Sequence, residues 1–296
     1  MIRNNSTIGY INTLRKAFKN WFLVGILIAV RFNSFTVMLR ENQRKQRWKR
    51  IQVLNHIVAK RIQSSGTGLE IYPDENKVRF TYRNQILTFY GYQQNGWVQK
   101  EINNFEYYKL NFQNKVVIDI GANSGATSIY FAINGAKKVI AIEPMPRTYE
   151  YLKRNVEVNK LESVIQCING AVSNENKEQM IQVDGNEMGL GAKINFSDHS
   201  TDKAMVAVIN INTLVDSLKE TDIVVKMDCE GCEYCTILNL KPESLLKIDQ
   251  IMLEYHNGWK TIFKFLKENN FAVELLNKPR KSRGIIYARN ESKNSI

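Results

Sequence analysis

The chain has 296 residues and a mass of 34.3 kDa, enough for one sizeable core with accessory elements. It contains no internal repeat or low-complexity tract, which excludes repeat architectures. Its net charge of +12 is unevenly placed: residues 1–62 hold 13 Lys and Arg against one acid, Glu41, whereas the rest hold 28 basic and 28 acidic side chains. A core that acts on nucleic acid usually carries its own basic face, so the neutral remainder argues against such a partner.

The N-terminal segment, residues 1–62, surrounds an apolar stretch at 21–30 (WFLVGILIAV) with basic residues. Ten residues are too few to cross a bilayer as a helix, which needs about 20, and no small-residue cleavage site follows. Two interpretations stay open: a helix packed on the core, or one that lies on an anionic membrane surface through residues 1–50. The basic run at 41–50 (ENQRKQRWKR) fits either a phosphate-contacting patch or a solvated helix face.

Residues 69–92 alternate between apolar and polar side chains in the manner of strands, with turn signals at 73–76 and 83–85. This pattern predicts a small antiparallel meander. We therefore expect residues 63–112 to form an accessory β cap that borders the substrate pocket. The junction to the rest of the chain is not rich in Pro or Gly, so the parts should pack together.

Residues 115–125 (KVVIDIGANSG) predict a buried strand that runs into a glycine turn and then a helix from Ala126 to Asn134. The order of residues departs from G-x-G-x-x-G, which makes a pyrophosphate cradle the weaker interpretation. An Asp at a strand end followed by alternate glycines is typical of S-adenosylmethionine (SAM) sites, where free backbone N–H groups would hold the cofactor's carboxylate. The predicted cofactor contacts here are Asp119, Gly121, Ala122, Asn123 and Gly125.

A second strand at 138–142 ends in Glu143, which lies 143 − 121 = 22 residues after Gly121. An acidic residue about 20 residues after the glycine turn accepts hydrogen bonds from ribose hydroxyls in nucleotide-binding α/β units. Either motif alone is a weak signal. Together, in a strand, turn, helix and strand unit, they predict a SAM pocket with Glu143 as the ribose ligand.

A third strand, at 223–227, leads into Asp228 and a glycine turn with the pattern K-x-D-x-E-G-x-E (residues 226–233). With VVIDIGANSG, AIEP at 141–144 and IMLEYH at 251–256, this pattern resembles the FkbM-type family of SAM-dependent methyltransferases over about residues 113–290. The resemblance implies methyl transfer to a hydroxyl, often on a sugar or a sugar-bearing small molecule. It also implies that Asn169 and Ala171 border the adenine.

Attack of an oxygen on a sulfonium methyl needs the reactants held at close range and a place for the hydroxyl proton. Strand ends at the carboxyl edge of the sheet supply the candidate groups, of which we predict Asp228, Glu230, Glu233 and His256 as catalytic. Clustered carboxylates repel one another, so at least one should have a raised pKa. The alternatives are helix N-terminal electrostatics for Glu230 and Glu233 and a structural role for His256.

Two metal interpretations were weighed. A divalent ion that bridges Asp228, Glu254 and His256 is conceivable, but no spacing motif requires it, so no metal is predicted. Cys229, Cys232 and Cys235 resemble part of an iron–sulfur ligand run, yet a helix start would aim the thiols apart. We expect small buried residues and a reducing compartment, not a disulfide framework.

Alternating strands and helices after residue 112 predict an α/β, Rossmann-like methyltransferase fold at 113–296, with a mostly parallel seven-stranded sheet and helices on both faces, plus the basic N-terminal helical and β extension. The predicted function is O-methylation of a small molecule or glycan, with nucleic acid an unlikely partner. The alternatives are an RNA or DNA methyltransferase that uses the basic segment, and a membrane-associated SAM-binding protein without turnover. We expect a cytoplasmic location, with attachment to the inner face of the membrane as an open alternative.

Overall fold

The computed structural model describes residues 69–72, 75–91, 109–182, 203–276 and 282–293. The chain divides into two compact units, Met1–Leu87 and Thr88–Ile296. The predicted basic segment 1–62 and the predicted membrane-facing helix lie outside the described residues, so both stay predictions. No helix in the described ranges is long and apolar enough to cross a membrane.

The first unit contains the antiparallel strands β1 (Leu69–Tyr72) and β2 (Lys77–Tyr82), in which Leu69 pairs with Phe80. Strand β3 (Gln85–Tyr90) follows, and the three strands are hydrogen-bonded in chain order. Positive φ angles at Asn76, Arg83 and Asn84 form the turns, because Asn tolerates the left-handed region better than most residues. The meander predicted from the alternating pattern is confirmed.

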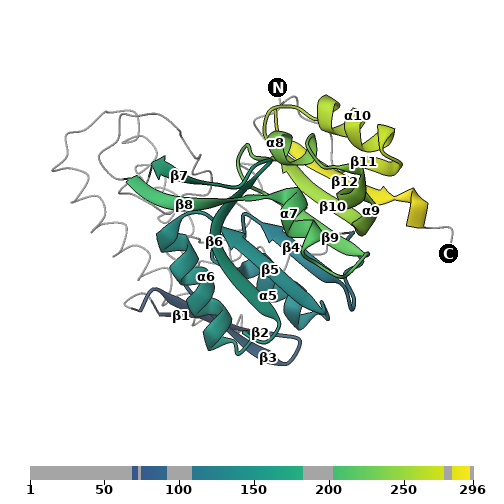
Figure 1. The fold of residues 1–296 in the computed structure, drawn as a ribbon. Coiled ribbons are helices and arrows are strands. Elements are labelled where there is room, and N and C mark those ends of the chain that lie inside the picture. The colour runs from purple at the N-terminus through teal and green to yellow at the C-terminus, as the bar shows by residue number, and fades with distance from the viewer. Residues whose placement is uncertain (1–68, 73–74, 92–108, 183–202, 277–281, 294–296) are drawn as a thin grey trace, which may run out of the picture. The chain divides into compact units, whose positions relative to one another are not determined.

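The second unit is built on a nine-stranded sheet with the order β11-β12-β10-β9-β4-β5-β6-β8-β7 (Figure 1). The pairs from β10 through β8 are parallel, and β12, β11 and β7 are antiparallel to their neighbours. The strands are β4 (Val116–Ile120), β5 (Lys138–Glu143), β6 (Ile165–Ser173), β7 (Lys177–Gln182), β8 (Lys203–Asn210), β9 (Ile223–Met227), β10 (Ile248–Tyr255), β11 (Phe271–Leu276) and β12 (Gly284–Asn290).

Helices connect the parallel strands, as the alternating pattern predicts. Pro146 begins α6, where a missing N–H costs nothing, and the Asn210 side chain accepts hydrogen bonds from the N–H groups of Asn212 and Thr213 to cap α7. The helices are α5 (Ala126–Ile133), α6 (Pro146–Val158), α7 (Ile211–Asp216), α8 (Glu233–Ile237), α9 (Pro242–Lys247) and α10 (Lys260–Glu268), and a short 3₁₀ turn covers Glu291–Lys293.

The central strands are buried along their whole length, which explains their runs of Val and Ile. Every residue of β4 and β9 is buried, including the polar Asp119 and Lys226. A sheet covered on both faces favours continuous β-branched residues over alternation. Two polar side chains inside such strands must therefore have a specific partner or ligand.

The predicted Rossmann-like, mostly parallel fold is confirmed, but the described residues form a sheet of nine strands instead of seven. The additional pair, β7 and β8, continues the sheet beyond β6, where Gly170–Ser173 pairs in parallel with Ala207–Asn210. Strand β6 extends through Asn169 and Ala171.

Candidate cofactor and acceptor site

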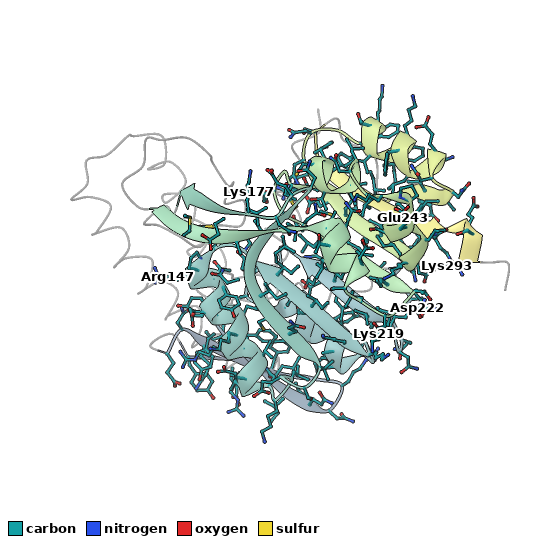
Figure 2. The ribbon with its side chains drawn as sticks, in the orientation of Figure 1. Arg147, Lys177, Lys219, Asp222, Glu243 and Lys293 are labelled. Atoms are coloured by element: carbon teal, nitrogen blue, oxygen red, sulfur yellow. A yellow bond between two sulfur atoms is a disulfide. The ribbon has the colours of Figure 1, made fainter. Side chains whose placement is uncertain are left out.

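Two turns meet at the carboxyl edge of the parallel strands, one after β4 and one after β9. The N–H of Asp228 donates to the Ile120 carbonyl at 2.9 Å, which joins the turns directly. Gly121 has φ +75°, and a Cβ at that position would lie 2.0 Å from the Asp228 carbonyl oxygen. Only glycine permits this approach of two backbones. In Figure 2, Lys219 and Asp222 mark the opposite, amino end of β9, so the site lies at the far end of this strand.

Asp119 lies beneath the first turn in a buried ion pair. Its Oδ1 is 3.0 Å from the Lys226 ammonium, and its Oδ2 accepts a hydrogen bond from the Ser128 hydroxyl at 2.6 Å. Oδ1 accepts no hydrogen bond among the described residues, but the nearby Lys226 ammonium compensates its charge. Lys226 also donates to the Gly121 carbonyl at 3.3 Å. Both oxygens of Asp119 therefore face protein groups that hold the turn in place.

The backbone N–H groups of the first turn all donate to acceptors within the protein. Gly121 and Ala122 share the Ile142 carbonyl, Asn123 donates to the Glu143 carboxylate, and Ser124 donates to the Asn123 side chain. Gly125 closes the turn by donating to the Ala122 carbonyl at 2.9 Å. In the structure these groups bind the turn itself and β5, and their contact with the cofactor's carboxylate stays a prediction.

Glu143 ends β5 beside this turn and is buried. Its Oε2 accepts from the Asn123 N–H at 2.9 Å and its Oε1 from the Met145 N–H at 3.0 Å, so each oxygen keeps a lone pair for another donor. Burial raises the pKa of Glu143 to about 7, although the two N–H groups oppose the shift. A buried carboxylate with unused acceptor capacity at this edge fits the two ribose hydroxyls of SAM.

The two residues expected near the adenine occupy β6. The Asn169 side-chain amide donates to the carbonyls of Glu143 and Pro144, at 2.9 and 3.1 Å, and so fixes the end of β5. Ala171 pairs with Val208 of β8. Their contact with the cofactor stays a prediction.

Four acidic side chains and one imidazole gather after β9 and β10. His256 Nδ1 lies 2.7 Å from Glu233 Oε1, while His256 Nε2 lies 3.2 Å from Glu230 and 3.9 Å from Asp228. Glu233 is fully buried, and the His256 side chain is only 9% exposed. The sequence therefore correctly predicts that Asp228, Glu230, Glu233 and His256 come together. Their catalytic roles belong to the proposal below.

The charges of this group shift two pKa values. Burial, reinforced by the charge of Asp228, raises the pKa of Glu254 despite its contact with Arg283. Burial alone would lower the pKa of His256, but the hydrogen bond and charge of Glu233, with the charges of Glu230 and Asp228, raise it overall. We name Asp228, Glu230, Glu233, Glu254 and His256 the acidic cluster.

Arg283, just before β12, pairs with Glu254 and lies 3.2 Å from Glu230. No sequence pattern identified it, since it is 53 residues from Glu230 in the chain and reaches the cluster only because β12 pairs with β10. Lys226 and Ser128 were also missed as partners of Asp119. The pairing of β4 with β9 places Lys226 beside Asp119, a contact that depends on the strand order.

The prediction of small buried cysteines without a disulfide is wrong, since two of them form a disulfide and Cys235 is exposed. Cys229 and Cys232 form a disulfide, with their Cα atoms 5.5 Å apart, whereas Cys167 and Cys235 are free. The positive φ angles of Glu230 (+54°) and Gly231 (+128°) fold the turn between them back on itself. In this turn the two Cα atoms lie within the range that a disulfide spans.

Comparison with known proteins gives one family model, the TRM5/TYW2 methyltransferase domain, which matches residues 97–213. Histone-arginine methyltransferase CARMER of Drosophila mojavensis is 35% identical over 96 residues, which is 30% of this chain and 18% of that protein. The Drosophila ananassae protein of the same name is 34% identical over the same share. The chain thus spans less than a fifth of the length of these curated relatives.

Solved structures of similar fold include M. jannaschii TYW2 in complex with AdoMet, with 15% identity and a TM-score of 0.37 over 74% of this chain and 87% of that one. They also include the B. subtilis M1A22 tRNA methyltransferase TrmK, with 17% identity and a TM-score of 0.35 over 65% of this chain and 64% of that one.

These findings correct two predictions. The matching family model is TRM5/TYW2 and not FkbM, so the resemblance to the FkbM-type family was wrong. The predicted small-molecule or glycan acceptor, with nucleic acid unlikely, is contradicted together with the FkbM resemblance that implied it. The neutral charge balance of residues 63–296 does not exclude a nucleic-acid acceptor, because residues 1–62 carry the basic surplus. The chain has a Rossmann-like methyltransferase fold, residues 97–213 match a methyltransferase-domain model, and the cofactor is S-adenosylmethionine.

Proposed function

We propose that this protein is a SAM-dependent methyltransferase that methylates a nitrogen of an RNA base. One observation carries the proposal: the turn after β4 and the turn after β9 touch through the Asp228–Ile120 hydrogen bond. Glu143, the proposed ribose ligand, and the acidic cluster therefore belong to one edge of one sheet. A cofactor held on one side of Gly121 has proton-accepting groups close by on the other.

The protein's task in such a reaction is to hold the acceptor nitrogen against the methyl group and to receive its proton. SAM supplies an activated methyl on its sulfonium. The new nitrogen–carbon bond forms as the carbon–sulfur bond breaks, S-adenosylhomocysteine leaves, and the proton passes to a carboxylate of the pair Asp228 and Glu230. His256, fixed by the buried Glu233, faces both carboxylates.

The charge distribution supports an RNA acceptor. Residues 1–62 carry 13 Lys and Arg with a single acid, and such a surplus favours binding to phosphates. The acidic cluster repels phosphates, so an RNA that binds this protein would place a base, and not its backbone, at the cluster. The family model of a TRM5/TYW2 domain agrees with this assignment.

A specific observation favours a second candidate acceptor, the guanidinium of a protein arginine. Within the protein, the Arg283 guanidinium already contacts Glu254 and Glu230, so the cluster accommodates this group. The partial likeness to histone-arginine methyltransferases points the same way. We rank it second because it gives the basic segment no role.

The two candidates separate in a single labelling experiment. The full chain is incubated with methyl-labelled SAM and with RNA and protein fractions from the same cells, and the product is digested with nuclease or protease. We expect label that nuclease releases from RNA, and none with Asp228→Asn, which removes one carboxylate of the pair. Label released only by protease would favour the arginine acceptor, and no label in either fraction would contradict both.

Lys177→Gln provides the matched control, because among the described residues that side chain forms an ion pair with Glu175 at the surface. It should transfer methyl groups at the rate of the unmodified protein. SAM affinity is measured alongside, so that a lost reaction in Asp228→Asn can be separated from lost cofactor binding.

A further inference from the structure

We propose that the acidic cluster binds one divalent metal ion through Asp228, Glu254 and His256. One ligand atom from each of these residues lies within 4.8 Å of the other two. Ions of this class hold oxygen and nitrogen ligands at about 2.0–2.4 Å, so ligands on opposite sides of an ion are about 4.0–4.8 Å apart. The three groups thus fit around a single ion.

Three buried polar atoms of the acidic cluster lack a hydrogen-bond partner among the described residues, which favours a bound cation. Asp228 Oδ1, Glu233 Oε2 and His256 Nε2 are buried, and none has a hydrogen-bond partner within the described ranges. The His256 side chain is only 9% exposed and is therefore more than nine-tenths buried. A buried polar atom without a partner is costly, and a cation between Nε2 and the carboxylates would satisfy both sides.

The hydrogen bond at the other ring nitrogen prepares His256 as a ligand. Glu233 is fully buried, and its Oε1 lies 2.7 Å from His256 Nδ1. When Nδ1–H donates to this carboxylate, Nε2 carries the lone pair. Metal-binding histidines are oriented in this way by a carboxylate behind the ring. The lone pair then faces Glu230 at 3.2 Å and Asp228 at 3.9 Å, an arrangement that repels unless a cation lies between them.

The charge count also favours a bound cation. Asp228, Glu230, Glu233 and Glu254 contribute four negative charges when ionised, and Arg283 contributes one positive charge at Glu254 and Glu230. Three negative charges remain if His256 is neutral. Two carboxylates with one imidazole suit a transition metal ion of the Mn²⁺ or Zn²⁺ class better than Ca²⁺, which prefers oxygen ligands alone.

The proposed ion lies in the acceptor half of the proposed active site and leaves Glu230 as the carboxylate that receives the proton. Its existence does not depend on the identity of the acceptor. Ion binding is therefore measured without SAM or RNA, so that failure of the metal proposal and failure of the proposed function give different results.

The test is a Mn²⁺ titration of the full chain, treated with chelator and nuclease and then desalted, with free Mn²⁺ followed by electron paramagnetic resonance. We expect one saturable site per chain that Zn²⁺ empties. Glu254→Gln and His256→Ala should each weaken binding about tenfold or more. Glu268→Gln is the control, because Glu268 is an exposed acid that, within the described ranges, pairs with Lys264 at 3.7 Å, and the ion affinity of this variant should not change.

Thermal unfolding of each variant shows whether it folds. If His256→Ala does not fold, Glu254→Gln decides, since it keeps the shape of a partly exposed side chain. Absence of a saturable site would overturn the proposal and leave a protonated His256 as the cation of the cluster. Equal affinities of Glu254→Gln and Glu268→Gln would overturn it as well.

Discussion

Glu143 is the single residue on which cofactor binding should depend most. Both of its oxygens accept one backbone N–H and retain a lone pair, and hydroxyl donors would bind these lone pairs only when the carboxyl group is ionised. Its pKa of about 7 in the cofactor-free protein means that near neutrality a substantial fraction is protonated. When SAM binds near neutral pH, the protein molecules in which Glu143 is protonated should therefore release that proton.

This linkage predicts a pH dependence with a defined sign. Affinity for SAM is full above the pKa of about 7 and falls as the pH drops through it, because protonated Glu143 loses acceptor capacity. Between pH 8 and pH 6 the ionised fraction falls about tenfold, so calorimetry should give a dissociation constant larger by about that factor at pH 6. In Glu143→Gln the affinity should be low at both values. The same dependence in the variant would assign the titration to another group.

The buried pair of Asp119 and Lys226 should matter for stability. Lys226 is 6% exposed and Asp119 is fully buried, so Lys226→Met leaves an uncompensated charge in the core, at a cost of about 3–5 kcal/mol in the free energy of unfolding. Lys109→Met removes the partner of Glu274 from an exposed pair, which should cost about 0–1 kcal/mol. Urea unfolding measures both. Equal values would show that Asp119 is stabilised chiefly by Ser128.

At the scale of elements, the contact between two turns defines the site. A Cβ on residue 121 would lie 2.0 Å from the Asp228 carbonyl oxygen, whereas one on residue 231 would meet no atom within 4 Å. Both glycines have positive φ, so alanine is strained at either position. Only Gly121→Ala must also push the two turns apart.

Comparison of these two variants therefore distinguishes the effect of pushing the turns apart from the effect of backbone strain. Gly121→Ala should lose most SAM affinity and methyl transfer together, since it displaces the turn that positions Glu143 and the turn that carries Asp228. Gly231→Ala should reduce transfer far more than SAM affinity. Binding and rate measurements on both proteins provide the check, and a Gly121→Ala protein with ordinary SAM affinity would refute the argument.

The elements were predictable from the sequence where the pattern was local. Strand ends at Asp119, Glu143 and Asp228 were visible because a polar residue interrupts a buried apolar run, and the shared edge followed from parallel pairing. Contacts between distant strands were not visible. Lys226 next to Asp119, and Arg283 next to Glu254, depend on which strands are neighbours. The disulfide depends on two positive φ angles at Glu230 and Gly231 that residue type alone does not specify.

At the scale of the whole molecule, charge is divided between two functions. The basic surplus of residues 1–62 favours binding of phosphates, and the acidic cluster favours binding of a proton or a cation. The two regions therefore have different binding partners. The charge balance of residues 63–296 alone therefore does not exclude a nucleic-acid substrate. A nucleic-acid enzyme needs a basic surface only where the backbone of its substrate lies.

The basic run at 41–50 offers the test of this division. Replacing Arg44, Lys45, Arg47, Lys49 and Arg50 with Gln should weaken RNA binding and make it less sensitive to salt, because each lost phosphate contact reduces the slope of log affinity against log salt by about 0.7 for single strands. SAM affinity should not change. Replacing Lys260, Lys264 and Lys267 of α10 with Gln gives the control for lost positive charge elsewhere. If both sets of substitutions lower the slope equally per charge, RNA is attracted by net charge alone, and the basic run has no special place in binding.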